Sequence, residues 1–153
     1  MYLIVIVAFM LVLPIGSILI EFAAGATDLV HIIGKWFVFW TGGLRLLTAG
    51  LSQIVRPAFT AQTIFKIQDE EAFKIVSELG FANVSMGAMS VLSIFFPAWI
   101  VPAALCTGLF YGLAGVGHAL NTTRTNKENM AMLSDLFVFL VLGFVVVAGF
   151  ATA

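Results

Sequence analysis

The feature that most constrains this chain is a series of apolar runs, each about as long as a bilayer is thick. The hydrocarbon core of a bilayer needs roughly 20 apolar residues in a helix. The 153-residue sequence offers five such runs, at residues 2–21, 36–55, 75–96, 99–120 and 129–150. We therefore predict an all-α fold in which residues 1–153 form one integral membrane bundle of five transmembrane helices. Four spans is the alternative, which applies if the first or the third run does not cross.

Composition supports the same class of protein. Hydrophobic residues make up 61% of the chain and charged residues 10%, whereas a soluble domain carries about a quarter charged residues. This excludes a soluble globular protein. The formal net charge is −1, so no basic excess favours nucleic acid as a partner. The expected partner is the lipid bilayer, and the expected location is a bacterial inner (cell) membrane.

The residues between the runs predict how the spans begin, end and connect. Asp28 is placed to cap the helix that follows it, and Arg56-Pro57 closes the second span. A very short uncharged turn at Pro97 predicts that the third and fourth spans form an antiparallel hairpin. Lysine and arginine favour the cytoplasmic side. With five spans, one side holds the N-terminus together with Arg56, Lys66, Lys74, Arg124 and Lys127, while Lys35 marks the other. This predicts a cytoplasmic N-terminus.

A faint repeat links the second and fourth spans. Gly43-Leu44 and Ala49-Gly50 match Gly108-Leu109 and Ala114-Gly115, and Gln53 and His118 follow at equivalent offsets. The repeat predicts two helix hairpins plus a fifth helix, an arrangement found in membrane bundles. Chance is an equal alternative, because glycine is frequent in membrane helices.

Arg45 is the strongest chemical signal, because it lies in the middle of the second span. A charge at the bilayer centre costs roughly 2.5–3.5 kcal/mol on insertion scales and rarely faces lipid. Thr41, Thr48 and Ser52 share its helical face, so we expect a polar stripe that points into the bundle. The expected partner is Asp135, with Glu78 second. From the predicted topology, Arg45 and Asp135 differ in depth by ~10 Å at 1.5 Å per residue.

Two interpretations of this charge stay open. A buried ion pair would lock the helices together, whereas a functional arginine would hold an anion or a lipid headgroup, or form part of an ion path. The candidate buried polar or ligand-binding residues are Arg45, Asp135, Glu78, His118 and Asn83. For His118, a plain hydrogen bond at an interface is the alternative. No catalytic constellation and no metal-ligand spacing is found, the lone Cys106 excludes a disulfide, and the cofactor is undetermined. Enzyme activity is therefore the less favoured interpretation.

Small residues recur at Ala104, Gly108 and Gly112 on one helical face. Such a seam permits close helix packing within a chain or between protomers. The leading functional prediction is an accessory or assembly subunit of a larger membrane complex, without catalysis of its own, whose partners are other membrane subunits or further copies of the chain. The alternative is a small transporter, or a membrane protein that binds a lipid, a quinone or a small molecule in a polar pocket around Arg45.

Two resemblances bear on the family. The segment WFVFWTGGLRLLTAGLSQIVRP resembles the first helix of DoxX-like membrane proteins, small bacterial four-helix bundles. That resemblance implies an association with membrane redox complexes that act on quinones. The segments ELGFANVSMG, GLFYGLAGVGHALN and NKENMAMLSDLFVF are similar to an uncharacterised family of bacterial membrane proteins, and this similarity covers most of the chain.

Overall fold

The fold is all-α throughout the residues that the computed structural model describes, 2–122 and 124–151. This confirms the predicted helical bundle. Three π-helical turns and one 3-10 turn interrupt or extend the α-helices. In chain order, the elements are α1 (Tyr2–Val7), η1 (Ala8–Val12), α2 (Leu13–Ala23), α3 (Leu29–Phe37), η2 (Val38–Arg45), α4 (Leu46–Val55), α5 (Pro57–Phe59), η3 (Thr60–Ile64), α6 (Ala72–Leu92), η4 (Pro97–Trp99), α7 (Ile100–Leu120) and α8 (Asn126–Ala151).

Four helices are long and apolar enough to cross a membrane: Ile4–Ala23, Ala72–Leu92, Pro97–Leu120 and Glu128–Ala151. The continuous helix α3–η2–α4 is not among them. The four-span alternative assumed that the first or the third run does not cross, but both are among these four helices. The second run falls short because Arg45, Gln53 and its threonines lower its hydropathy. It also begins at Leu29 instead of residue 36, with the Asp28 side chain accepting the backbone N–H of His31 as an N-cap.

Two closely packed helix pairs organise the bundle, as the glycine repeat predicts. The pairs are η2–α4 with α6, and α7 with α8. A methyl group on Gly50 would lie 2.7 Å from the Gly80 carbonyl oxygen of α6, and one on Gly115 would lie 2.8 Å from the Leu136 side chain of α8. These close approaches require glycine, because any larger side chain would push the helices apart.

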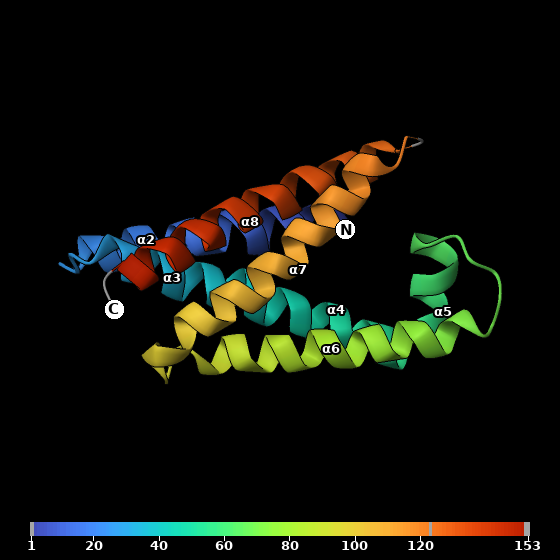
Figure 1. The fold of residues 1–153 in the computed structure, drawn as a ribbon, viewed down its shortest axis with the longest axis horizontal. Helices are drawn as coiled ribbons and strands as arrows, with labels where there is room; N and C mark the ends of the chain where they lie inside the picture. Colours follow the sequence, from blue (N-terminus) through green and yellow to red (C-terminus); the bar gives the residue numbers. More distant parts are fainter. Residues whose placement is uncertain (1, 123, 152–153) are drawn as a thin grey trace.

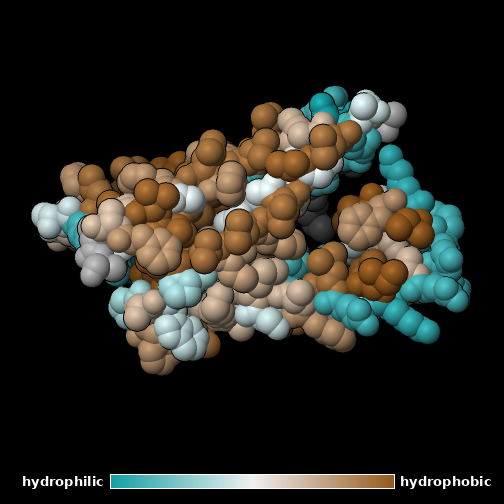
Figure 2. Space-filling model, in the orientation of Figure 1, coloured by the Kyte–Doolittle hydropathy of each residue, from teal (hydrophilic) through white to brown (hydrophobic). Residues whose placement is uncertain are grey.

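The two pairs diverge from a common end (Figure 1). Helices α6 and α7 are joined by the turn at Pro97, but they make few contacts, because each is held by its own glycine-mediated partner. The two helices run in opposite directions from this short turn, as predicted, but they splay apart beyond it (Figure 1). The α5–η3 segment stands across the open end (Figure 1), and Figure 2 shows the surface hollowed between this segment and the tip of α7–α8. Lys66, just after η3, is close enough to Glu128 of α8 for their charges to interact.

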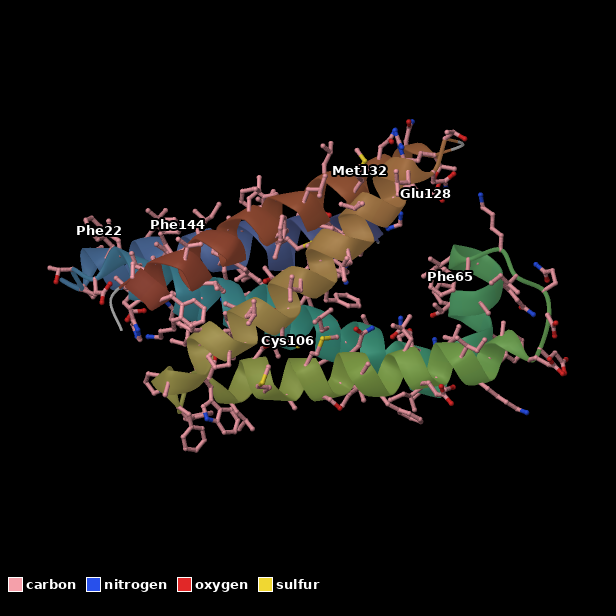
Figure 3. All side chains as sticks on the ribbon, in the orientation of Figure 1. Phe22, Phe65, Cys106, Glu128, Met132 and Phe144 are labelled. Atoms are coloured by element: carbon pink, nitrogen blue, oxygen red, sulfur yellow. The ribbon has the colours of Figure 1, made fainter. Side chains whose placement is uncertain are left out.

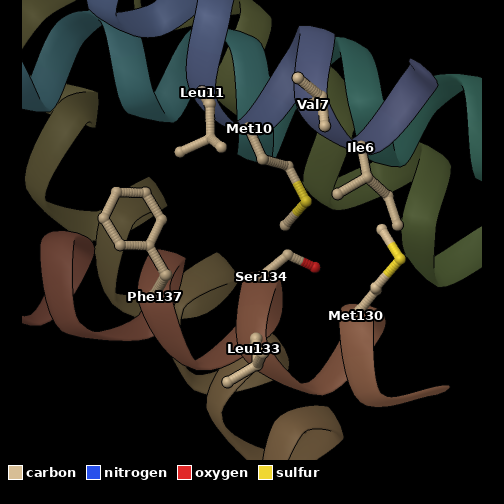
Figure 4. Close-up of a pocket in the computed structure, with 8 residues that line it drawn as sticks. All are labelled: Ile6, Val7, Met10, Leu11, Met130, Leu133, Ser134 and Phe137. Carbon is tan, nitrogen blue, oxygen red and sulfur yellow. The ribbon is translucent and has the colours of Figure 1, made fainter. Parts of the chain in front are cut away.

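The N-terminal helix packs along the outside of this arrangement. Pro14 lacks the N–H that would bond to the Met10 carbonyl, and the turn before it, η1, is π-helical. Glu21 accepts hydrogen bonds from Lys35, at 2.9 Å, and from the Trp36 indole, which ties α2 to α3. A groove of about 260 Å³ separates this helix from α8 (Figure 4). Its lining consists of Ile6, Val7, Met10, Leu11, Met130, Leu133, Ser134 and Phe137.

Large apolar side chains cover much of the outer surface (Figure 2). The most exposed include Ile20, Leu113 and Leu120, each with more than 70% of its surface uncovered by the chain. A soluble monomer rarely exposes apolar patches of this extent. The buried core lies where the helices converge, around Met10, Val38, Leu46, Ala103 and Leu142. A bilayer is the solvent that suits such a surface.

Candidate functional site

Arg45 is the last residue of η2, where this helix continues into α4. Its side chain is half-buried, and its Nε atom is buried without a hydrogen-bond partner. A guanidinium carries five N–H donors and cannot lose its charge in a protein. The guanidinium of Arg45 therefore has at least one N–H without an acceptor inside the membrane-embedded bundle.

The polar stripe predicted around Arg45 is only partly internal. Thr41 is fully buried, and its hydroxyl donates to the Phe37 carbonyl oxygen at 2.6 Å. Thr48 and Ser52 are exposed, so the prediction that they point into a packed interior is wrong. Beyond Arg45 the helix still packs on α6 through Leu46 and Gly50. Thr48 and Ser52 therefore lie on its other, open face.

Asp135 of α8 is the second charged group at this level, and only 6% of it is exposed. Its carboxylate accepts no hydrogen bond from the residues that the structure describes. Arg45 lies close enough for the two charges to interact. No nitrogen of Arg45, however, lies within the 4.0 Å of an Asp135 oxygen that would define an ion pair. The ion pair found in the described part of the chain joins Lys35 and Glu21, at 2.9 Å.

Tyr111 of α7 explains why Arg45 and Asp135 lie at the same level. Its buried hydroxyl donates to the Thr41 carbonyl oxygen at 2.7 Å, and the next residue, Gly112, packs on the Phe139 ring of α8. Arg45 lies one helical turn beyond Thr41, and Asp135 one turn before Phe139, which is about 5.4 Å in each case. Since α8 runs antiparallel to α3–η2–α4 (Figure 1), both turns lead toward the open end. On this count the two residues lie closer in depth than the ~10 Å expected from the sequence.

A second polar group bridges the other helix pair. The Asn83 side-chain amide of α6 donates to the Gln53 side-chain oxygen of α4 at 2.8 Å. Asn83 is 2% exposed, and its Oδ1 atom is buried without a partner. Gln53 lies eight residues beyond Arg45, about 12 Å farther toward the open end. Polar groups therefore occur along both helix pairs that bound the hollow.

The remaining predicted residues lie nearer to that end. His118 of α7 is half-buried and close enough to Glu128 for their charges to interact. Glu78 is exposed on α6 and forms no ion pair with Arg45, so it does not join the Arg45–Asp135 group. The Arg124 guanidinium is engaged elsewhere, because it donates to the backbone carbonyls of His118, Ala119 and Asn121 and closes the C-terminal end of α7. Figure 3 shows Phe65 and Glu128 at the same end of the molecule.

This arrangement is suited to binding. Arg45 offers donors to an anionic group, and Asp135 offers an acceptor to a cationic one. The described residues contain no group of three or more His, Cys, Asp or Glu side chains that would hold a metal ion.

Comparison with known proteins gives one family. A family model described as "Family of unknown function (DUF6790)" matches residues 1–151. The chain belongs to this family. The match agrees with the similarity to an uncharacterised family, and it extends over almost the whole bundle of this DUF6790 member. No curated protein and no solved structure matches the chain. The DoxX resemblance remains a prediction.

Two residues of the site were missed from the sequence. Tyr111 stands in an apolar run, where a buried aromatic side chain is unremarkable, and only the fold reveals its bond to Thr41. Gln53 was noticed for its place in the glycine repeat but was not paired with Asn83. The equivalence of Gln53 and His118 was the one available signal, because both follow a packing glycine by three residues.

Proposed function

We propose that this DUF6790 protein is an integral membrane protein that binds a molecule carrying an anionic group, with Arg45 as its anchor. The observation that carries the proposal is the buried Nε atom of Arg45, which has no hydrogen-bond partner. A guanidinium that leaves water needs acceptors, and a carboxylate or phosphate supplies them with matching geometry. A hydrogen bond to a charged group contributes about 1.5–3 kcal/mol.

The chemistry of the surroundings favours an amphipathic ligand. Apolar side chains cover the outer faces of the helices, so a molecule that reaches the hollow from the side passes through the bilayer. A lipid headgroup or a smaller anion with an apolar part fits this setting. The shared chemistry is an anionic phosphate or carboxylate.

The first prediction concerns ligand-induced stabilisation. We expect phospholipid or inorganic phosphate, added separately to the protein in mild detergent, to raise its melting temperature, because a ligand of the folded state stabilises it. Arg45→Gln removes the charge and abolishes the rise. Arg56→Gln is the matched control, because it removes an exposed arginine at the end of the same helix and leaves the rise unchanged.

Two outcomes of this measurement would overturn the proposal. One is a wild-type protein that neither compound stabilises. The other is an Arg45→Gln variant that responds as the wild type does. Stabilisation by phospholipid alone identifies a headgroup as the ligand, whereas stabilisation by phosphate alone identifies a free anion.

The accessory-subunit role is the alternative. Its motivation was the seam at Ala104, Gly108 and Gly112, which is filled within the chain: Leu142 and Phe139 of α8 pack against the two glycines. The seam therefore gives no argument for a partner helix or a second copy. Co-purification of a stoichiometric subunit after gentle extraction from native membranes would favour this alternative instead.

We further propose that α3–η2–α4 crosses the bilayer as a fifth span, in a bacterial inner membrane. The helix lies between the other spans and contacts the N-terminal helix, α6, α7 and α8, so protein covers Thr41 and the Nε atom of Arg45 near its middle. Arg56, Lys66, Lys74 and Arg124 lie at the end of the bundle that holds the open hollow, and Lys35 lies at the other. The excess of positive residues supports a cytoplasmic location for the open end and the N-terminus.

A further inference from the structure

A purely anionic ligand at Arg45 would leave the Asp135 carboxylate without a partner. The carboxylate is buried in an apolar bundle, accepts no hydrogen bond from the described residues, and forms no ion pair with Arg45. A buried ionised carboxylate without donors is strongly disfavoured. A ligand that brings a positive charge would allow the carboxylate to stay ionised there.

The hydroxyl groups buried where the helices converge are already engaged. Tyr111 donates to the Thr41 carbonyl oxygen, Thr41 donates to the Phe37 carbonyl oxygen, and Thr107 donates to the Ala103 carbonyl oxygen. A hydroxyl group has one hydrogen to donate, and each of these three donates it to a backbone carbonyl oxygen. The three hydroxyls therefore offer Asp135 no free donor, and a bound ligand is one source of such a donor.

The electrostatics of the pair restrict what that donor is. A ligand that carries only negative charge would gain at Arg45, but it would be repelled by Asp135, whose charge acts in the same region. A ligand that carries only positive charge would meet the opposite difficulty at Arg45. A molecule with an anionic group and an ammonium group a few bonds apart complements both side chains at once.

We propose that the hollow selects a zwitterionic ligand, whose anionic group is held by Arg45 and whose ammonium group is held by Asp135. This inference rests on the proposed binding function and adds the substrate class. An ethanolamine phospholipid headgroup and a free amino-acid-like molecule share this chemistry. In both, the ammonium donates to the Asp135 carboxylate, and the phosphate or carboxylate accepts from the Arg45 guanidinium.

The test compares phospholipids with and without an ammonium group. The purified protein is incubated in detergent with equal amounts of phosphatidylethanolamine and phosphatidylglycerol, and the bound lipid is counted by native mass spectrometry. We expect the wild type to retain phosphatidylethanolamine about tenfold or more over phosphatidylglycerol, the scale of one charged hydrogen bond. Asp135→Asn should lose this preference while still binding lipid, and Asp135→Glu should keep it.

The failures of the two proposals are distinguishable. A wild type that binds both lipids equally, or an Asp135→Asn variant with an unchanged preference, overturns the zwitterion inference and leaves the anionic site standing. An Arg45→Gln variant that still binds both lipids overturns the proposed function itself. The wild-type comparison needs no variant, so the inference stays testable even where a substitution prevents folding.

Two further measurements complete the test. O-phosphoethanolamine, added to the protein without lipid, raises the melting temperature if the ligand is a free molecule, whereas only phosphatidylethanolamine does so if the ligand is a headgroup. In the charge-swapped double variant, Arg45→Asp with Asp135→Arg, we expect no recovery of folded yield over the single variants. Recovery would demonstrate a direct ion pair and would contradict a ligand between the two side chains.

Discussion

Single glycines set the distance between helices, and Gly50 is the clearest case. A methyl group there would lie 2.7 Å from the Gly80 carbonyl oxygen and 2.9 Å from the Val84 backbone nitrogen. Backbone atoms cannot move aside as a flexible side chain does, so the α4–α6 pair would have to separate.

The corresponding prediction is that Gly50→Ala destabilises the protein by about 1–3 kcal/mol, the usual cost of overpacking. Thermal unfolding in detergent measures this cost. Gly143→Ala is the control, because nothing lies within 4 Å of the added methyl group, and we expect its unfolding temperature to stay close to that of the wild type. Equal effects of the two substitutions would contradict the close α4–α6 packing.

At this same scale, the sequence located the charged residues but not their relation. Arg45 and Asp135 stand out from sequence alone, because charges inside apolar runs are rare and costly. Their common level depends on the Tyr111–Thr41 hydrogen bond and on the packing of Gly112 against Phe139. Contacts between residues so distant in sequence leave no local pattern to read. Glu78 looked equivalent by composition, but its helix turns it to the exposed side.

Among the elements, α7 has an unusual C-terminal end. The last carbonyls of a helix have no partners within it, and here the Arg124 guanidinium fills that role by donating to the carbonyls of His118, Ala119 and Asn121. Asn129 of α8 holds the same side chain by accepting a hydrogen bond of 3.0 Å from its Nε atom. Arg124 therefore joins the end of α7 to the start of α8.

We predict that Arg124→Ala loosens this end without unfolding the bundle. Hydrogen–deuterium exchange should accelerate over residues 116–121, because the helix end loses the donor that holds its carbonyls, and should stay unchanged in α6. Arg56→Ala serves as the control, because Arg56 is exposed and lies at a different helix end. Unaltered exchange at the end of α7 in the Arg124 variant would refute the capping role.

Helix identities were predictable, whereas some boundaries and pairings were not. Long apolar runs and the Asp28, Pro57 and Pro97 signals located every long helix. The second helix begins at Leu29, earlier than predicted, because Asp28 caps it and its mixed first turns still pack inside the bundle. The π-helical turns carry no recognisable sequence signature, apart from Pro14 after η1. Helices α6 and α7 splay apart because α6 packs on α4 and α7 packs on α8. The short turn between them does not predict this.

For the whole molecule, the arrangement predicts which loops share a side of the membrane. In a Cys106→Ser background, the single substitutions Thr27→Cys and Gln68→Cys place thiols on either side of the α3–η2–α4 helix, and Thr122→Cys places one after α7. We expect a membrane-impermeant thiol reagent to label positions 27 and 68 from opposite sides, and positions 68 and 122 from the same side. Labelling of positions 27 and 68 from one side would show that this helix does not cross, and would leave four spans.

The central claim is that Arg45 and Asp135 face each other across a ligand instead of binding each other. An experimental structure of the protein, crystallised from a lipid phase that contains phosphatidylethanolamine, measures this directly. We predict non-protein density between the guanidinium and the carboxylate, with its phosphate at Arg45 and its ammonium at Asp135. A direct contact, with a nitrogen of Arg45 within ion-pair distance of an Asp135 oxygen and no density between them, would contradict the claim.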